Sequence, residues 1–407
     1  MTNDRKLNLK KKFSSFFLII FFIIFLIPYS LPGGFSANYS FILLPIFLIL
    51  LTGKFKKPNR NIVLIVSFFF LIFILGTIFQ FELFQHLDRR FFSFIIFMTI
   101  FSYIVIDIDK ETITAFKIAV VLIVLYIVTW KISKFYTYSA AQAEGHYGNL
   151  KFYIGSSRYG FVYLLAFWII VFYKPTTKLI LILKYSAILL IIAGIFITYS
   201  RTTIISLVLS SGFFYLNNFI FSKRKFFSKI FFLILIPIIF LVLVNLSQKY
   251  FSNTFNYFSE TLFAYLSIDG FIALSERLSN LDSSEGFRFD LWGKAIHYVS
   301  LTPLIGSGFL GCWIMYEDMV CSAHNQYVDV LFRVGFLGFY LYLLILFQVF
   351  NYLKNQHRDL LYGFISILIY GFFHETFKLS QGAFILTFMI GMMMTYQRNK
   401  YNEKNVS

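Results

Sequence analysis

Two arginines stand where phosphate chemistry is possible. Arg201 follows a long apolar run in the stretch 198–202, and Arg288 lies in the mixed stretch 286–292. A guanidinium at such a boundary can bind phosphate oxygens through two parallel hydrogen bonds. The alternatives are an interfacial anchor for Arg201 and an ion pair with Glu285 or Asp290 for Arg288. The residues alone leave both interpretations open.

His324 opens the next long apolar run, in the stretch Ser322-Ala323-His324-Asn325-Gln326. An imidazole at a membrane surface titrates near neutral pH, so it can take a proton from a hydroxyl group. The alternative is a capping or packing role at a helix start. Arg158 begins another apolar run and is a candidate third phosphate contact. The pair His374-Glu375 favours an exposed turn.

The composition requires a membrane to position these residues. Of the 407 residues, 58% are hydrophobic, 22% aromatic and only 14% charged, and the mean hydropathy is +0.74. Lipid is the solvent that tolerates this much apolar surface. The Lys and Arg residues behind the net charge of +17 lie mainly in alternate loops, so the charge is a topology signal and predicts no nucleic-acid partner.

Apolar runs of suitable length predict an all-α polytopic membrane protein with about twelve transmembrane helices. One set of alternate loops holds about twice as many Lys and Arg residues as the other, which predicts that both termini are cytoplasmic. The expected spans are 13–29, 39–52, 61–80, 91–106, 113–130, 153–173, 180–198, 203–221, 227–246, 327–350, 360–373 and 382–397.

The organisation expected from these spans has three parts. Residues 1–246 hold transmembrane helices 1–9, residues 247–326 form one long periplasmic loop, and residues 327–407 hold helices 10–12 and a cytoplasmic tail. Within the loop, the apolar spacing of 287–299 predicts an amphipathic helix at the interface. Pro303 ends that helix, and Gly306 and Gly308 allow a tight turn.

Other residues bear on the same loop and on the helix that follows it. Gly335 and Gly338 are predicted to let another helix approach. Arg333, nine residues after His324, is predicted to meet a carboxylate or polar groups of the cytoplasmic leaflet. Cys312 and Cys321 allow either a disulfide or two free thiols.

Three short motifs, in order and on the same predicted side, resemble those of a bacterial family. They are Thr198-Tyr199-Ser200-Arg201, then Arg288 and Trp292 with Pro303-x-x-Gly306-x-Gly308, and last His324-Asn325-x9-Gly335-x-x-Gly338. The third is similar to an H-[NSQ]-x9-G-x-x-[GTY] signature. Together with the span count and the long outer loop, they resemble the O-antigen ligase and polymerase superfamily of surface-polysaccharide assembly.

The resemblance implies a GT-C-like helical fold in the inner membrane and glycosyl transfer on its periplasmic side without metal or cofactor. The donor would be a glycan on undecaprenyl pyrophosphate, and the acceptor lipid A-core for a ligase or a lipid-linked glycan for a polymerase. His324 would act as the base, and Arg201 and Arg288 would hold the pyrophosphate. Arg158 is added to that group from its position alone.

Two alternatives come from other classes. A polysaccharide transporter or flippase would carry inverted repeats, broken helices and charges at the membrane midplane, whereas the notable charges here cluster at one predicted surface. A structural assembly subunit would not need the polar groups at 201, 288 and 324. The residues favour the ligase slightly over the polymerase and identify neither the sugars nor the oligomeric state.

Overall fold

The computed structural model describes about half of the chain, and all its regular elements there are helices. The described residues are 16–24, 26–27, 60–79, 94–95, 97–98, 108–143, 159–197, 200–220, 284–308, 323–376 and 379–406. They separate into two units, one of residues 1–207 with 295–407 and the other of residues 208–294. The all-α class is therefore confirmed for the described residues.

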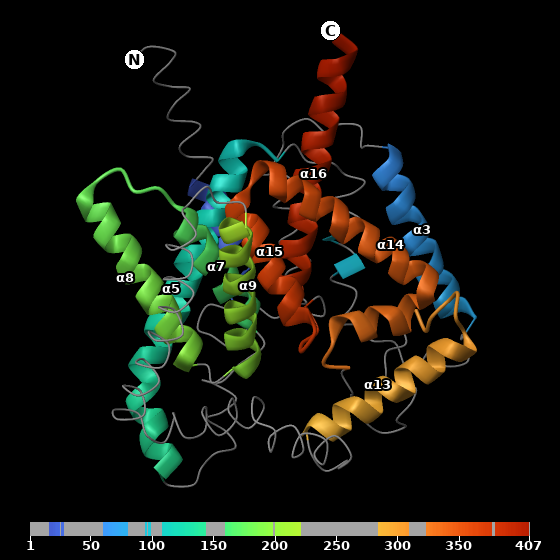
Figure 1. Ribbon diagram of the computed structural model, residues 1–407, viewed down its shortest axis with the longest axis horizontal. Helices are drawn as coiled ribbons and strands as arrows, with labels where there is room; N and C mark the ends of the chain where they lie inside the picture. The colour runs from blue at the N-terminus through green and yellow to red at the C-terminus, as the bar shows by residue number, and fades with distance from the viewer. Residues whose placement is uncertain are drawn as a thin grey trace. The chain divides into compact units, whose positions relative to one another are not determined.

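The described helices of the larger unit overlap the expected spans (Figure 1). They are α3 (Arg60–Ile78), α5 (Lys110–Ala143), α7 (Gly160–Phe172), α8 (Lys178–Ile197), α14 (Gln326–Gln356), α15 (Arg358–Gly371) and α16 (Ser380–Val406). However, α5, α14 and α16 end well beyond the predicted span ends at 130, 350 and 397. The overlap follows from the requirement that a helix satisfy its own backbone hydrogen bonds inside lipid.

Four described helices are long and apolar enough to cross a membrane: Arg60–Ile78, Lys110–Trp130, Lys178–Ile195 and Gln326–Gln356. α8 illustrates why lipid is needed, because large apolar side chains such as Leu179 and Leu189 are 66% and 67% exposed. The protein is therefore a membrane protein, and the full set of about twelve spans stays a prediction. The predicted spans 39–52 and 227–246 lie outside the described residues.

Most residues of α7 are buried, and the helix packs against α5, α8 and α15. Its contacts with α15 are antiparallel: Phe161 meets Tyr370 with ring centroids 6.1 Å apart, and Phe172 stacks on Tyr362 at 5.5 Å. Between these contacts the indole N–H of Trp168 donates to the Ser366 hydroxyl at 2.7 Å. A paired polar contact of this kind lets an indole lie fully inside the bundle.

A second group of helices surrounds α14, which contacts α3, α15 and α16. A cluster of phenylalanines joins α16 to α5 and to the helical segment 16–24. Phe116 stacks on Phe388 at 4.4 Å, and Phe22 lies edge-on to both. These rings account for part of the high aromatic content, because large rigid rings fill the spaces between helices with little loss of side-chain entropy.

Some contacts within the larger unit join residues at helix ends that are predicted to be cytoplasmic. Lys184 donates to the carbonyl oxygens of Val171 and Tyr173, and Tyr352 lies beside Tyr396 at 5.3 Å. All these residues lie at predicted cytoplasmic helix ends. The helix ends predicted to be periplasmic meet elsewhere, as described below. Which compartment each end faces stays a prediction.

The smaller unit contains most of α9 (Arg201–Ile220) and the first part of α13 (Ser284–Leu301). α13 confirms the helix expected at 287–299, and its buried side chains Leu291, Ala295 and Val299 recur every four residues. Phe289 and Ile296, seven residues apart, are each 54% exposed. This apolar face suits a helix at a membrane interface. The three-part division at residues 246 and 326 stays a prediction.

Candidate functional site

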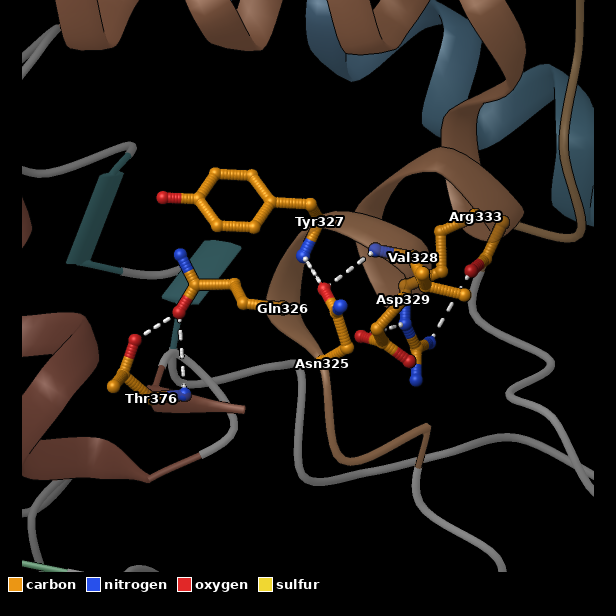
Figure 2. A network of polar contacts seen from close by, with 8 residues as sticks. Asn325, Gln326, Tyr327, Val328, Asp329, Arg333 and Thr376 are labelled. Carbon is orange, nitrogen blue, oxygen red and sulfur yellow. Dashed lines mark hydrogen bonds and ion pairs between the residues drawn. The ribbon is translucent and has the colours of Figure 1, made fainter. Parts of the chain in front are cut away.

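His324 lies directly before α14 in an unusual backbone conformation. Its φ of 49° is positive, which non-glycine residues rarely adopt and which costs about 1–2 kcal/mol. The next residue, Asn325, is the N-cap: its side-chain oxygen accepts from the backbone N–H groups of Tyr327 at 2.9 Å and Val328 at 3.2 Å (Figure 2). The cap fixes the start of the helix, so the position of His324 is determined by the backbone on its C-terminal side.

The first turn of α14 is tied to the turn that follows α15. The carboxamide oxygen of Gln326 accepts from both the backbone N–H and the hydroxyl of Thr376, and its nitrogen donates to the Tyr342 hydroxyl at 2.5 Å (Figure 2). Gln326, Tyr342 and Thr376 are all buried. A satisfied buried network of this kind rigidifies its surroundings.

One turn further on, Asp329 and Arg333 form an ion pair inside the protein. The Arg333 Nε donates to Asp329 Oδ2 at 2.9 Å, and the side chains are 0% and 3% exposed (Figure 2). Arg333 Nη1 also donates to the carbonyl oxygen of Gly308 at 3.3 Å. The prediction that Arg333 meets a carboxylate is confirmed. The guanidinium is fully buried in this ion pair.

α14 breaks at Gly335, where φ is 61° and ψ is −171°, and Figure 1 shows two helical segments meeting at an angle. The segment 303–308 satisfies the backbone groups that the break releases. Phe332 O and Arg333 O accept from the N–H groups of Ser307 at 2.9 Å and Gly308 at 2.8 Å, while Phe336 N–H donates to Pro303 O at 2.8 Å.

These contacts explain the spacing of the motif Pro303-x-x-Gly306-x-Gly308. A Cβ on Gly306 would overlap the Phe332 carbonyl, and one on Gly308 would overlap Thr77 of α3. The expectation that Gly335 serves helix approach is wrong, because its Cβ would meet the backbone of the 303–308 segment. Gly338 does face another helix, since its Cβ would lie 3.3 Å from Ile72 of α3.

The starts of α7 and α9 meet the end of α15. A Cβ on Gly160, the first residue of α7, would overlap the Thr203 hydroxyl of α9 and lie 2.8 Å from the Tyr370 ring of α15. Thr203 is held by Ser200, whose hydroxyl oxygen accepts from the Thr203 hydroxyl at 2.7 Å. These are all helix ends predicted to face the periplasm.

His374 connects this junction to His324. Its ring stacks on Tyr370 with centroids 5.0 Å apart, and the edge-on His324 ring lies 6.4 Å away. The expectation of an exposed turn at 374–375 is wrong: both residues are only partly exposed, and Glu375 Oε1 has no contact with solvent. Sequence reasoning missed this because the turn becomes buried only through the packing of α14 against α15.

The predicted cationic residues are placed to different extents. Arg201 is the first residue of α9, two residues before Thr203, and its side chain lies outside the described part of the structure. Arg158 directly precedes the described residues of α7 and lies outside them. Arg288 is half-buried on α13 in the smaller unit, where Asp290 pairs with Lys294 at 2.9 Å. Cys312 and Cys321 also lie outside the described residues.

The described part of the chain thus defines a helical membrane protein with a polar site at one end of its larger unit. Within that part, no group of three or more His, Cys, Asp or Glu side chains is arranged to hold a metal ion. Residues 186–343 match the family model described as O-antigen ligase. This match supports the resemblance of this part of the chain to the O-antigen ligase superfamily, a glycosyltransferase-like family. No curated protein matches the chain.

Proposed function

We propose that this protein is an O-antigen ligase, which transfers a glycan from undecaprenyl pyrophosphate to lipid A-core in the periplasmic leaflet of the inner membrane. The observation that carries the proposal is the common location of His324 and the start of α9. A Cβ on Gly160 would meet both Thr203, two residues after Arg201, and Tyr370, and the Tyr370 ring stacks on His374, whose ring lies 6.4 Å from that of His324. The family match at 186–343 includes Arg201, Arg288 and His324.

The reaction is a single displacement at the anomeric carbon of the donor glycan. The acceptor hydroxyl oxygen attacks this carbon, the bond from the carbon to the pyrophosphate oxygen breaks, and its electron pair departs with undecaprenyl pyrophosphate. The hydroxyl proton passes to a ring nitrogen of His324. Attack opposite the leaving group inverts the anomeric configuration. No general acid is required, because pyrophosphate is already a good leaving group.

Positive charge near the departing oxygens supplies the main stabilisation. Negative charge grows on the pyrophosphate as the glycosidic bond breaks, and guanidinium groups at a partly dry interface stabilise this charge more strongly than they would in water. We assign this role to Arg201 and Arg288, with Arg158 as a third candidate. His324 suits the role of base because the capped start of α14 holds its backbone in place.

A polymerase reading shares the same site and differs only in the acceptor, which would be a second lipid-linked glycan. The complete His324-Asn325-x9-Gly335-x-x-Gly338 signature favours the ligase. Deleting the gene and separating the lipopolysaccharide on a gel distinguishes the two. Loss of all O-chains with accumulation of carrier-linked polymer indicates a ligase, core bearing one repeat indicates a polymerase, and unchanged glycan excludes both.

The assignment of individual residues is tested with purified full-length protein, native donor and native acceptor. His324→Ala is expected to lower the transfer rate by roughly 100-fold or more, as loss of a general base does. Arg288→Ala is expected to abolish measurable transfer, and both variants should accumulate and unfold like the wild type. His297→Ala and Lys294→Ala are matched controls from α13, since both side chains are exposed. Wild-type rates in either site variant would refute the mechanism.

A further inference from the structure

The turn between α15 and α16 is held against the first turn of α14 by buried polar contacts. Thr376 in this turn is 0% exposed and donates through both its backbone N–H and its hydroxyl to the Gln326 carboxamide oxygen (Figure 2). Tyr327, next in α14, donates through its hydroxyl to Leu368 O at 2.7 Å and packs on Phe372 with ring centroids 4.4 Å apart. Contacts with α14 therefore fix the position of this turn, as the N-cap of α14 fixes the position of His324.

The imidazole of His374 is oriented by two contacts with the end of α15. Its ring stacks on the buried Tyr370 ring at an interplanar angle of 25°, and its backbone N–H donates to Tyr370 O at 3.1 Å. His374 itself is partly exposed, as is His324. The two imidazoles thus reach the surface from a common buried base of Asn325, Gln326, Tyr370 and Thr376.

The spacing of the two rings suits a ligand with neighbouring oxygen atoms. The centroids are 6.4 Å apart and the ring planes meet at 69°. At this centroid separation, a ligand oxygen between the rings can lie within hydrogen-bonding distance, about 2.8 Å, of a nitrogen on each ring when those nitrogens point toward it. Adjacent hydroxyls of a sugar ring are neighbouring oxygens of this kind, since they lie within hydrogen-bonding distance of each other.

We propose that His374 is a second substrate-contacting residue of the transferase site. It binds a hydroxyl of the acceptor sugar while His324 takes the proton from the neighbouring attacking hydroxyl. This inference rests on the proposed function. His374 itself neither gains nor loses a proton in the step. Its contribution is to orient the acceptor, which makes the attack effectively intramolecular.

The opposing explanation is that His374 is only an aromatic ring packed on Tyr370, and two substitutions separate the roles. His374→Phe keeps the stacked ring and removes the hydrogen-bonding nitrogens, whereas His374→Gln keeps a hydrogen-bonding group and loses the ring. Both full-length variants are assayed beside wild type and His324→Ala, with donor and acceptor concentrations varied separately and the thermal midpoint recorded.

We expect His374→Phe to lower kcat/KM for the acceptor roughly tenfold, the factor that one hydrogen bond supports. Its KM for the donor and its thermal midpoint should stay at the wild-type values, and His374→Gln should recover much of the lost kcat/KM. Full acceptor kcat/KM in His374→Phe would overturn the inference. So would an increase in the KM for the donor, or a loss that follows the thermal midpoint.

This experiment distinguishes failure of the proposed role of His374 from failure of the proposed function. If wild type transfers glycan and His324→Ala does not, a fully active His374→Phe variant removes only the role of His374. If wild type transfers nothing, or His324→Ala retains full transfer, the proposed function falls and the role of His374 falls with it.

Discussion

Gly335→Ala should destabilise the protein and remove no group that takes part in the reaction, although Gly335 belongs to the same signature as His324. The backbone at Gly335 has φ of 61° and ψ of −171°, a combination that essentially only glycine adopts. A Cβ there would lie 2.7 Å from both the Leu304 carbonyl carbon and the Pro303 oxygen, and 2.9 Å from the Ile305 nitrogen. Because all three are backbone atoms, no side-chain rotation relieves the overlap.

The expected cost combines backbone strain with lost hydrogen bonding. Holding a non-glycine residue in this conformation costs about 1–3 kcal/mol. Moving the 303–308 segment away lengthens the Phe336 N–H to Pro303 O bond, now 2.8 Å, and an unmade buried hydrogen bond costs about 1–3 kcal/mol. A total loss of about 2–6 kcal/mol would be a large share of the stability of an ordinary domain.

The assay follows purified full-length protein in detergent through an unfolding titration, together with its abundance in the membrane. Gly335→Ala should lower both the midpoint and the abundance, and Gly335→Asn should give no rescue, because asparagine tolerates the left-handed helical region and not a ψ near 180°. The matched control is Gly212→Ala in α9, whose Cβ would meet nothing within 4 Å. A wild-type midpoint for Gly335→Ala would refute this account of the helix break.

Two further predictions concern buried and partly buried charges. Arg333→Met should destabilise the protein by roughly 3–5 kcal/mol, because it leaves the buried Asp329 carboxylate without a positive partner. Adding Asp329→Leu to this variant should restore much of the unfolding midpoint. An Arg333→Met variant as stable as the wild type would contradict this prediction. Burial and, secondarily, the Lys117 charge lower the pKa of His357 to about 4 from 6.5, so the unfolded chain takes up a proton as the pH falls below 6.5 while the folded protein does so only near 4. The free energy of unfolding should therefore fall as the pH is lowered from 6.5 to about 4. His357→Asn should flatten this decline in a series of thermal midpoints measured at different pH values. An unchanged slope would exclude His357 as the cause of the decline.

Much of the fold was predictable because lipid imposes a simple rule on sequence. Every backbone polar group inside a bilayer needs a partner within the helix, so long apolar runs mark helices with little ambiguity. The starts of α8, α9 and α14 lie within two residues of the predicted span starts at 180, 203 and 327. The Lys and Arg distribution predicts which helix ends share a side of the membrane, and that sidedness stays a prediction.

The motifs were recognisable from the sequence, but their physical roles were not. Capping was the alternative role for His324, and the structure places the N-cap at the next residue, Asn325. Gly335 reads as a helix-packing residue, yet it breaks α14, because the 303–308 segment is present to bind the released backbone groups. Such pairing between segments about thirty residues apart has no local signature.

The sequence by itself thus determined that the protein crosses a membrane, where most described helices lie along the chain, and which family it resembles, since these depend on hydrophobicity and short motifs. Only the tertiary structure decided that Arg333 is buried against Asp329 and that His374 stands beside His324. Both outcomes depend on how α14 packs against its neighbours, and a side chain's burial and its partners are properties of that packing rather than of its own position along the chain.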